Sequence, residues 1–225
     1  QRIFHTVSAV SCPYTYNFYM HTNCSDGKLT PPELMQQAID IGLRAFAITD
    51  HHTLAGYFQA KSWFEDWQWR HPRSLRGSHN SNGGRSSAPR LFPGVEITAS
   101  MAGTEVHILG YGFAPKHDAI EPYLHHTAPT GRAMAASTVV RAIQTAGGLA
   151  VLAHPARYRV SVDVLIPEAQ KLGFDGVEAY YAYGNPKQWQ PCAEQTPRVE
   201  ALAERHRLLT TCGTDTHGSS LLRRI

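Results

Sequence analysis

The stretch Tyr19-Met20-His21-Thr22-Asn23-Cys24-Ser25-Asp26-Gly27 decides how the rest of the chain is interpreted. It overlaps an aromatic run, 16–20, that is typical of a β-strand. His21 stands where this strand should end, and Asp26 follows in a turn whose glycine lets the carboxylate fold back toward the imidazole. An imidazole and a carboxylate at a strand end are suitable ligands for a metal ion.

Apolar runs alternate with helical patterns along the chain. Seven segments are predicted to be strands: 16–20, 45–49, 91–98, 105–113, 149–153, 175–181 and 208–212. Helices are predicted at about 31–41, 54–67, 134–146 and 165–172, with another after residue 196. Thr30 and Glu33 are expected to form a capping box, and Thr196 to cap the last helix. Such alternation implies parallel strands with right-handed crossovers, hence a barrel or a doubly wound sheet.

Size and composition fit one α/β domain. The chain has 225 residues, of which 42% are hydrophobic, an ordinary globular fraction. We expect no membrane span and no signal peptide. The four cysteines show no C-x-x-C spacing, so we expect free thiols and a cytoplasmic protein. The first residue is Gln1, which is consistent with a trimmed chain or a part of a longer protein.

The positive charge is concentrated in one segment. The formal net charge is +3, and residues 70–90 carry five arginines and no acidic residue: Arg70, Arg73, Arg76, Arg85 and Arg90. Because residues 71–90 are also rich in Ser and Gly and poor in apolar side chains, we predict a flexible loop there within a single barrel domain spanning 1–225. Basicity confined to one loop argues against a broad nucleic-acid surface.

Metal-ligating side chains recur at or near the predicted strand ends. They are five imidazoles and three carboxylates: His21, His51, His107, His154, His217, Asp26, Glu96 and Asp215. In a closed parallel barrel every strand ends on the same face, whereas a doubly wound sheet gathers ligands only at its switch point. Ligands from six of the seven strands therefore favour the barrel.

Such a cluster needs cations, because buried charges without partners are destabilising. Mixed nitrogen and oxygen ligands without thiolate suit Zn, Mn or Fe, and eight ligands suit two or three divalent ions. A carboxylate such as Glu96 could bridge two ions, between which a water becomes hydroxide near neutral pH and attacks phosphorus. At 51–52 two histidines compete, and we favour His51 because it follows the strand directly.

These residues resemble the PHP (polymerase and histidinol phosphatase) superfamily. The resemblance spans about 17–218 and rests on six motifs: Met20-His21-Thr22 with Ser25-Asp26-Gly27, Ile48-Thr49-Asp50-His51, Gly94-Val95-Glu96, Val106-His107-Ile108, Ala153-His154-Pro155, and Gly213-Thr214-Asp215-Thr216-His217-Gly218. It implies a distorted (β/α)7 TIM-like barrel, a trinuclear metal centre and phosphoesterase chemistry.

The resemblance also implies roles for single residues. Glu96 and Asp215 would join His21 at one ion. His107 and His154 would hold a second ion with Glu96, and Asp26, His51 and His217 would hold a third. Asp50, His51 and His154 are assigned as catalytic, and Arg157 is expected to bind substrate phosphate.

The sequence departs from the family pattern at Tyr19. The first motif of the family is His-x-His, and its first histidine falls on Tyr19; Asn17 likewise stands where an aspartate is usual. A phenol must lose its proton to ligate well, whereas neutral imidazole need not. The substitution leaves open a phenolate ligand, a weak or vacant first site, a silent domain, or a deliberate replacement.

Three functions follow from this reading. The first is a metal-dependent phosphoesterase that hydrolyses a small phosphorylated metabolite or nucleotide by a metal-activated hydroxide. The second is a 3′-exonuclease-like phosphodiesterase, disfavoured because no aromatic and basic stacking platform is evident. The third is a catalytically silent binding module, for which Tyr19 is the only support. The oligomeric state is not predicted, and no membrane partner is expected.

Overall fold

The computed structural model describes residues 2–72 and 89–225. Most of the loop predicted at 71–90 lies outside these residues. Seven strands form one sheet in chain order: β1 (Tyr16–Asn17), β2 (Ala45–Ile48), β3 (Arg90–Met101), β4 (Thr104–Tyr111), β5 (Leu149–Leu152), β6 (Gly176–Tyr180) and β7 (Leu209–Cys212). The α-helices are α1 (Pro31–Ile41), α2 (Ala55–Arg70), α3 (Ala136–Thr145), α4 (Val162–Lys171) and α5 (Gln195–Arg205).

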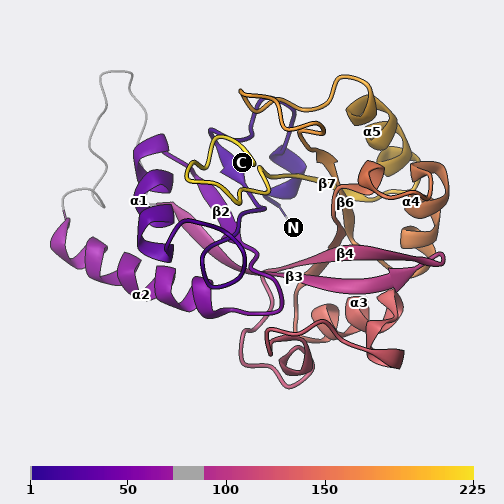
Figure 1. Ribbon diagram of the computed structural model, residues 1–225, viewed down its shortest axis with the longest axis horizontal. Coiled ribbons are helices and arrows are strands. Elements are labelled where there is room, and N and C mark those ends of the chain that lie inside the picture. The colour runs from indigo at the N-terminus through magenta and orange to yellow at the C-terminus, as the bar shows by residue number, and fades with distance from the viewer. Residues whose placement is uncertain (1, 73–88) are drawn as a thin grey trace.

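The sheet curls into a nearly closed barrel, which confirms the predicted fold class. The two ends of the sheet meet through residues just beyond the strands. Phe18 N–H donates to the Cys212 carbonyl at 3.0 Å, and Asp215 N–H donates to the Tyr19 carbonyl at 2.8 Å. Helices α1 and α2 lie on one side of the strands, α4 and α5 on the opposite side, and α3 beside β3 and β4 (Figure 1).

The prediction of parallel strands throughout is wrong at β3 and β4. These two strands form an antiparallel hairpin through Ala102 and Gly103, and β4 also runs antiparallel to β5. Both hairpin residues have positive φ, the conformation that such a tight turn requires. Each long strand was predicted correctly as a strand, but the short turn between them leaves no room for a crossover helix.

Of the two helix caps predicted from the sequence, the structure confirms the one at α1 and not the one at α5. At α1 the Thr30 side chain accepts from Glu33 N–H while Glu33 binds back to Thr30, so the capping box is confirmed. Thr196 is not a cap. The helix α5 begins one residue earlier, and the Thr196 hydroxyl instead donates to the Ala179 carbonyl of β6 at 3.2 Å.

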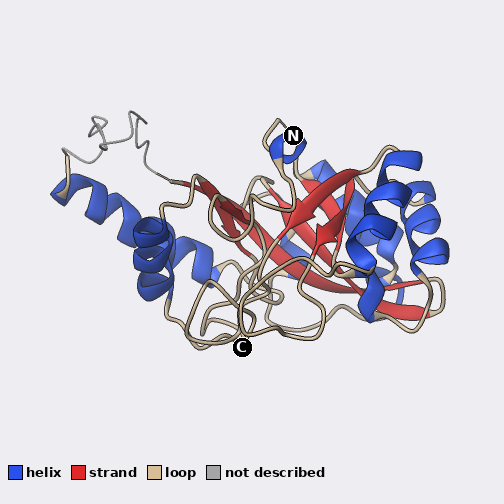
Figure 2. Ribbon diagram, turned by 90° about the horizontal axis from the view of Figure 1, so that it is seen from above, coloured by secondary structure: helices blue, strands red, loops and turns tan. Residues whose placement is uncertain are grey.

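The core consists of two apolar clusters, one of which packs α1 and α2 against β2. Leu34, Met35 and Ala38 of α1 are fully buried beside Phe46 and Ile48 of β2, and each large side chain buried this way contributes about 1.5–3 kcal/mol. All four cysteines are free thiols, as predicted. Among the described residues, every helix is too short or too polar to cross a bilayer. Seen from a second direction, irregular segments gather along one side of the strands (Figure 2).

Candidate metal centre

Two of the predicted ligands, His51 and Glu96, lie side by side at the barrel mouth because β3 is longer than β2. The strand β2 ends at Ile48, whereas β3 continues to Met101 beyond it. An isolated bridge pairs His51 with Glu96, and His52 N–H donates to the Glu96 carbonyl at 3.0 Å. Glu96 therefore lies within a strand yet level with the residues that follow β2. His52 turns its Nε2 to Thr98 instead, at 3.1 Å.

His107 also lies at the barrel mouth, although its strand β4 runs antiparallel to its neighbours β3 and β5. It belongs to the first half of antiparallel β4, and its carbonyl accepts from Ala153 N–H at 3.1 Å, directly before His154. His154 and Asp215 both have positive φ, 26° and 52°. Such a conformation costs a non-glycine residue on the order of 1–3 kcal/mol and is common at functional sites.

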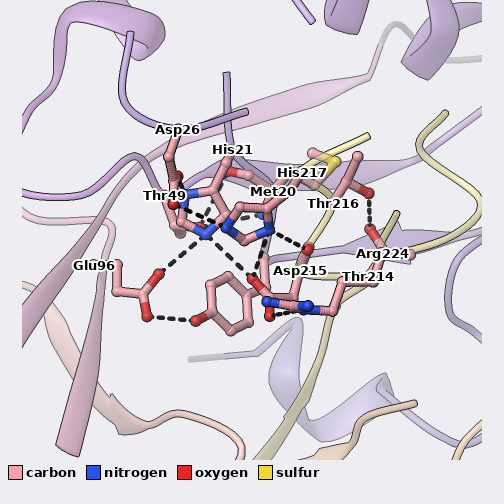
Figure 3. A network of polar contacts seen from close by, with 12 residues as sticks. Met20, His21, Asp26, Thr49, Glu96, Thr214, Asp215, Thr216, His217 and Arg224 are labelled. Atoms are coloured by element: carbon pink, nitrogen blue, oxygen red, sulfur yellow. Dashed lines mark hydrogen bonds and ion pairs between the residues drawn. The ribbon is translucent and has the colours of Figure 1, made fainter. Parts of the chain in front are cut away.

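The eight predicted ligands form three overlapping groups. Within each group the ligand atoms lie within 4.8 Å of one another: His21, Asp26, His51 and His217; Glu96, His107 and His154; and His21, Glu96 and Asp215. Figure 3 draws His21 at the centre of this network, with Asp26, Glu96, Asp215 and His217 around it. The grouping coincides with the sets implied by the family resemblance, with His21 shared by two of them.

Each oxygen of Glu96 faces a different group. Oε2 lies 3.0 Å from His21 Nε2, whereas Oε1 contacts His107 Nδ1 and the Tyr19 hydroxyl. Asp215 turns its Oδ1 toward His21 Nε2, at 3.3 Å. Asp26 contacts His217 Nε2 at 3.2 Å and His51 Nε2 at 3.6 Å. One carboxylate thus joins two groups, as a bridging ligand does.

The electrostatics of the cluster are those of carboxylates crowded with imidazoles. Burial opposes protonation of His21, but Asp215 and Glu96 outweigh it and raise its pKa to about 10. Burial would raise the pKa of Asp26, yet His217 and His21 hold it near 2. Burial lowers the pKa of His154 to about 3. The carboxylates therefore favour a positive partner strongly.

Four buried atoms of the cluster have no partner with hydrogen-bond geometry among the described residues: His21 Nε2, Glu96 Oε2, His107 Nδ1 and Asp215 Oδ1. A buried polar atom left unpaired costs about 1–3 kcal/mol. The donor set contains only imidazole nitrogen and carboxylate oxygen, which suits Zn, Mn or Fe. The residues present therefore fit divalent ions.

Asp50 lies beside the cluster and serves a different contact. Its Oδ1 accepts from Thr22 N–H and the Ser25 hydroxyl, and its Oδ2 accepts from the Thr22 hydroxyl, each at 2.7 Å. It is only 1% exposed. These bonds tie the end of β2 to the turn between His21 and Asp26, so Asp50 positions that turn.

The second oxygen of Asp215 is held by side chains that the sequence analysis missed, apart from Arg157. Oδ2 accepts from the Tyr181 hydroxyl and Arg224 Nε, both at 2.7 Å, and lies 3.4 Å from Arg157 Nη1. The three donors fix the carboxylate and leave Oδ1 toward the cluster. Arg224 follows no motif, so the sequence offered no signal for it.

A polar hollow of about 100 Å³ adjoins this side of the cluster. Its lining consists of Arg157, Tyr181, Tyr183, Gly184, Asn185 and Arg224. Two guanidinium groups face one carboxylate here, so positive charge is in excess. A hollow with such donors suits an anionic group.

Glu178 is a further buried carboxyl group near the cluster. Its Oε2 accepts from His154 N–H at 2.8 Å. Burial raises the pKa of Glu178 well above its usual range, which favours the protonated carboxyl group. A glutamate inside the apolar run 176–180 was a detectable signal in the sequence.

A larger, mostly apolar cavity of about 430 Å³ lies elsewhere, lined by Phe4, Phe18, Phe92 and Tyr111 among others. None of the eight candidate ligands lines it. We therefore place the chemistry at the barrel mouth and not in this cavity.

Tyr19 points into the cluster. Its side chain is 1% exposed, and its hydroxyl contacts Glu96 Oε1 and lies 3.2 Å from His154 Nε2. Burial and the charges of Asp215 and Glu96 raise the pKa of the phenol well above its usual range. In the absence of a cation the hydroxyl therefore stays protonated and donates a hydrogen bond to Glu96 Oε1.

Comparison with known proteins finds sequence similarity to hydrolases that cleave phosphate esters. Residues 17–92 match the family model of the PHP domain. A 5′-3′ exoribonuclease of Salmonella typhimurium is 33% identical over 109 residues, which are 48% of this chain and 31% of that protein. The chain thus spans about a third of the length of that relative.

Two other relatives extend over nearly the whole chain. A phosphoribosyl 1,2-cyclic phosphate 1,2-diphosphodiesterase of Eggerthella lenta is 26% identical and covers 90% of this chain and 94% of its own. A Bifidobacterium adolescentis protein assigned as a metal-dependent phosphoesterase superposes with a TM-score of 0.68 at 23% identity, covering 92% of this chain and 89% of that one. The structural similarity supports the fold.

Proposed function

We propose that the chain is a member of the PHP family and a metal-dependent phosphoric ester hydrolase that acts on a small phosphorylated metabolite or nucleotide. The observation that carries this proposal is the convergence of buried imidazole nitrogens and carboxylate oxygens at the barrel mouth, in close contacts that lack hydrogen-bond geometry. A cluster of this kind is stable only when cations supply the missing partners.

We assign two or three divalent ions of zinc, manganese or iron to the three groups. His21, Glu96 and Asp215 would hold one; Glu96, His107 and His154 a second; and Asp26, His51 and His217, with His21 beside them, a third. Bound there, such ions polarise phosphoryl oxygens and lower the pKa of water toward neutrality. Residues around the ions would bind the substrate and position the ligands.

The assignment of Arg157 to substrate phosphate is supported by its surroundings. Its side chain is 42% exposed, and one edge of its guanidinium is anchored by Asp215 and the Tyr181 hydroxyl. The remaining N–H groups are available to the hollow that Arg224 and Asn185 also line. A pre-oriented guanidinium loses less freedom when it binds an anion.

The three residues predicted to be catalytic take different roles in this proposal. The side chain of His51 is 27% exposed, so its ring borders the space that a substrate enters. Asp50 and His154 are buried, at 1% and 2% exposure. We assign Asp50 to holding the turn between His21 and Asp26, and His154 to the ion that Glu96 and His107 share.

A nucleotide or oligonucleotide end is the second candidate substrate. It is favoured by the similarity to 5′-3′ exoribonucleases, whose polarity is opposite to the 3′-exonuclease considered from the sequence. The similarity to a cyclic phosphate diphosphodiesterase instead favours a small cyclic ester. A silent binding module is disfavoured because eight ligand residues are present and converge.

The test compares hydrolysis of a phosphomonoester, a phosphodiester and a short 5′-phosphorylated RNA by protein prepared without chelator. We expect turnover of at least one ester that ceases with chelator and returns with Zn, Mn or Fe. Turnover that is insensitive to chelation, or no turnover of any ester by metal-loaded protein, would overturn the proposal.

A further inference from the structure

Tyr19 has a contact pattern that the proposed function does not use. Its hydroxyl lies between Glu96 and His154, two of the three members of one candidate ion site. The third member, His107, contacts the same Glu96 oxygen through its Nδ1. Four donor atoms thus converge: one phenolic oxygen, one carboxylate oxygen and two imidazole nitrogens.

The backbone holds Tyr19 in this position. Asp215 N–H donates to the Tyr19 carbonyl at 2.8 Å. A Cβ at Gly213 would lie 2.2 Å from the Tyr19 Cβ, so only glycine permits this close approach. The Tyr19 ring also stacks against the His154 ring, with centroids 5.9 Å apart and an interplanar angle of 25°. The hydroxyl therefore cannot swing away without disturbing two neighbours.

The Tyr19 hydroxyl faces the group of Glu96, His107 and His154. A phenol extends farther from its Cβ than an imidazole does. Its oxygen accordingly meets Glu96 Oε1, on the side of His107 and His154, whereas Glu96 Oε2 faces His21. Adjacent ligand atoms around an ion with bonds of about 2.1 Å lie roughly 3 Å apart. The 3.2 Å between the Tyr19 hydroxyl and His154 Nε2 fits that spacing.

We propose that Tyr19 is the fourth protein ligand, through its phenolate oxygen, of the ion held by Glu96, His107 and His154. This inference rests on the proposed function, because it requires that the cluster binds metal. On binding, the phenolic O–H bond breaks, its proton leaves to solvent, and an oxygen lone pair forms the bond to the ion.

The consequence is a division of labour between two neighbouring sites. Four protein ligands are typical of closed sites, whereas three ligands leave a position for water or substrate. With zinc, the Tyr19 site would be closed, and the site of His21, Glu96 and Asp215 would keep its open position. A hard phenolate and carboxylate with two imidazoles suit iron, which also provides a spectroscopic probe.

The test uses the full chain loaded with iron(II) without oxygen and then oxidised in air. Iron(III) bound to phenolate gives a visible charge-transfer band, and elemental analysis accompanies each spectrum. A second loading with zinc measures the ultraviolet difference band of tyrosinate. The variants are Tyr19→Phe, Tyr19→His and the control Tyr180→Phe, whose hydroxyl donates to Glu200 at 2.6 Å outside the cluster.

We expect the visible band and one tyrosinate per chain in the natural protein and in Tyr180→Phe, and loss of both in Tyr19→Phe. Tyr19→His should lack both signals while it still binds metal, which guards against a variant that merely misfolds. Bound metal without either signal, or equal signals in Tyr19→Phe, would overturn this inference alone. No bound metal in any protein would overturn the proposed function with it.

Discussion

Two buried polar regions lie side by side at the barrel mouth, each built around a carboxylate. The region of Asp50 is closed: both oxygens accept hydrogen bonds of 2.7 Å from Thr22 and Ser25. The region of Glu96 is open, because its Oε2 and three neighbouring atoms have no partner with hydrogen-bond geometry in the part of the chain described here. The difference teaches that a buried carboxylate does not by itself indicate a metal site, whereas imidazole and carboxylate atoms that converge without hydrogen-bond geometry do.

The largest expected effect is that of Glu96→Gln. An amide cannot bridge two ions, so metal should be lost from both groups that share Glu96 and hydrolysis should fall by at least about a hundredfold. Elemental analysis and an ester hydrolysis assay measure the two effects. The control Glu178→Gln keeps an oxygen that can accept from His154 N–H, so this variant should keep its metal. Full metal content in Glu96→Gln would show that Glu96 does not hold the ions of these two groups.

The next effect is that of Asp50→Asn, which tests the closed region. An amide group would turn a donor toward Thr22 or Ser25, and the free energy of unfolding should fall by about 1–3 kcal/mol. Urea unfolding of the chelated protein measures this loss. Because the turn carries His21 and Asp26, metal affinity should fall by about 10–100-fold, although saturating metal fills the site. Unchanged stability would show that these bonds do not hold the turn.

A smaller effect is expected for Arg157→Gln. Loss of a charge-assisted hydrogen bond of about 1.5–3 kcal/mol should raise KM by about tenfold or more, with little change in kcat or metal content. Steady-state kinetics on the best ester measures this split. The control is Arg198→Gln, an exposed arginine that pairs with Asp163 and belongs to none of the three ligand groups. Equal KM values for both variants would remove Arg157 from the substrate site.

The smallest effect is expected for Thr30→Ala, outside both regions. Removal of the capping box at α1 should cost about 1 kcal/mol of unfolding free energy, which thermal unfolding can measure. Metal content and hydrolysis should stay unchanged, because the Thr30 side chain bonds Glu33 and not a candidate ligand. A loss of metal in this variant would mean that the open region depends on global stability.

Much of the fold was predictable because its signals are local. The aromatic and apolar runs gave seven strands, and Thr30 with Glu33 marked the start of α1. The antiparallel hairpin was missed because 91–98 and 105–113 carry strand signals without a sign of their direction. Thr196 was misassigned because its hydroxyl has a tertiary partner, the carbonyl of Ala179, that no local pattern reveals.

The candidate site likewise contains residues that local motifs predict and residues that only the fold brings there. The eight predicted ligands follow recognisable strand ends and motifs, and the structure brings them together. Tyr181 and Arg224 hold Asp215 from segments without a motif, so only the fold brings them to it. The direction of the Tyr19 ring likewise depends on contacts with Gly213 and Asp215 that are far away in sequence.

The number of ions per chain, measured by elemental analysis of protein prepared without chelator, tests the central claim most directly. The open region around Glu96 predicts two or three divalent ions of zinc, manganese or iron, matching its three ligand groups. A protein that carries no such ion, and takes up none when all three metals are supplied, would contradict the account.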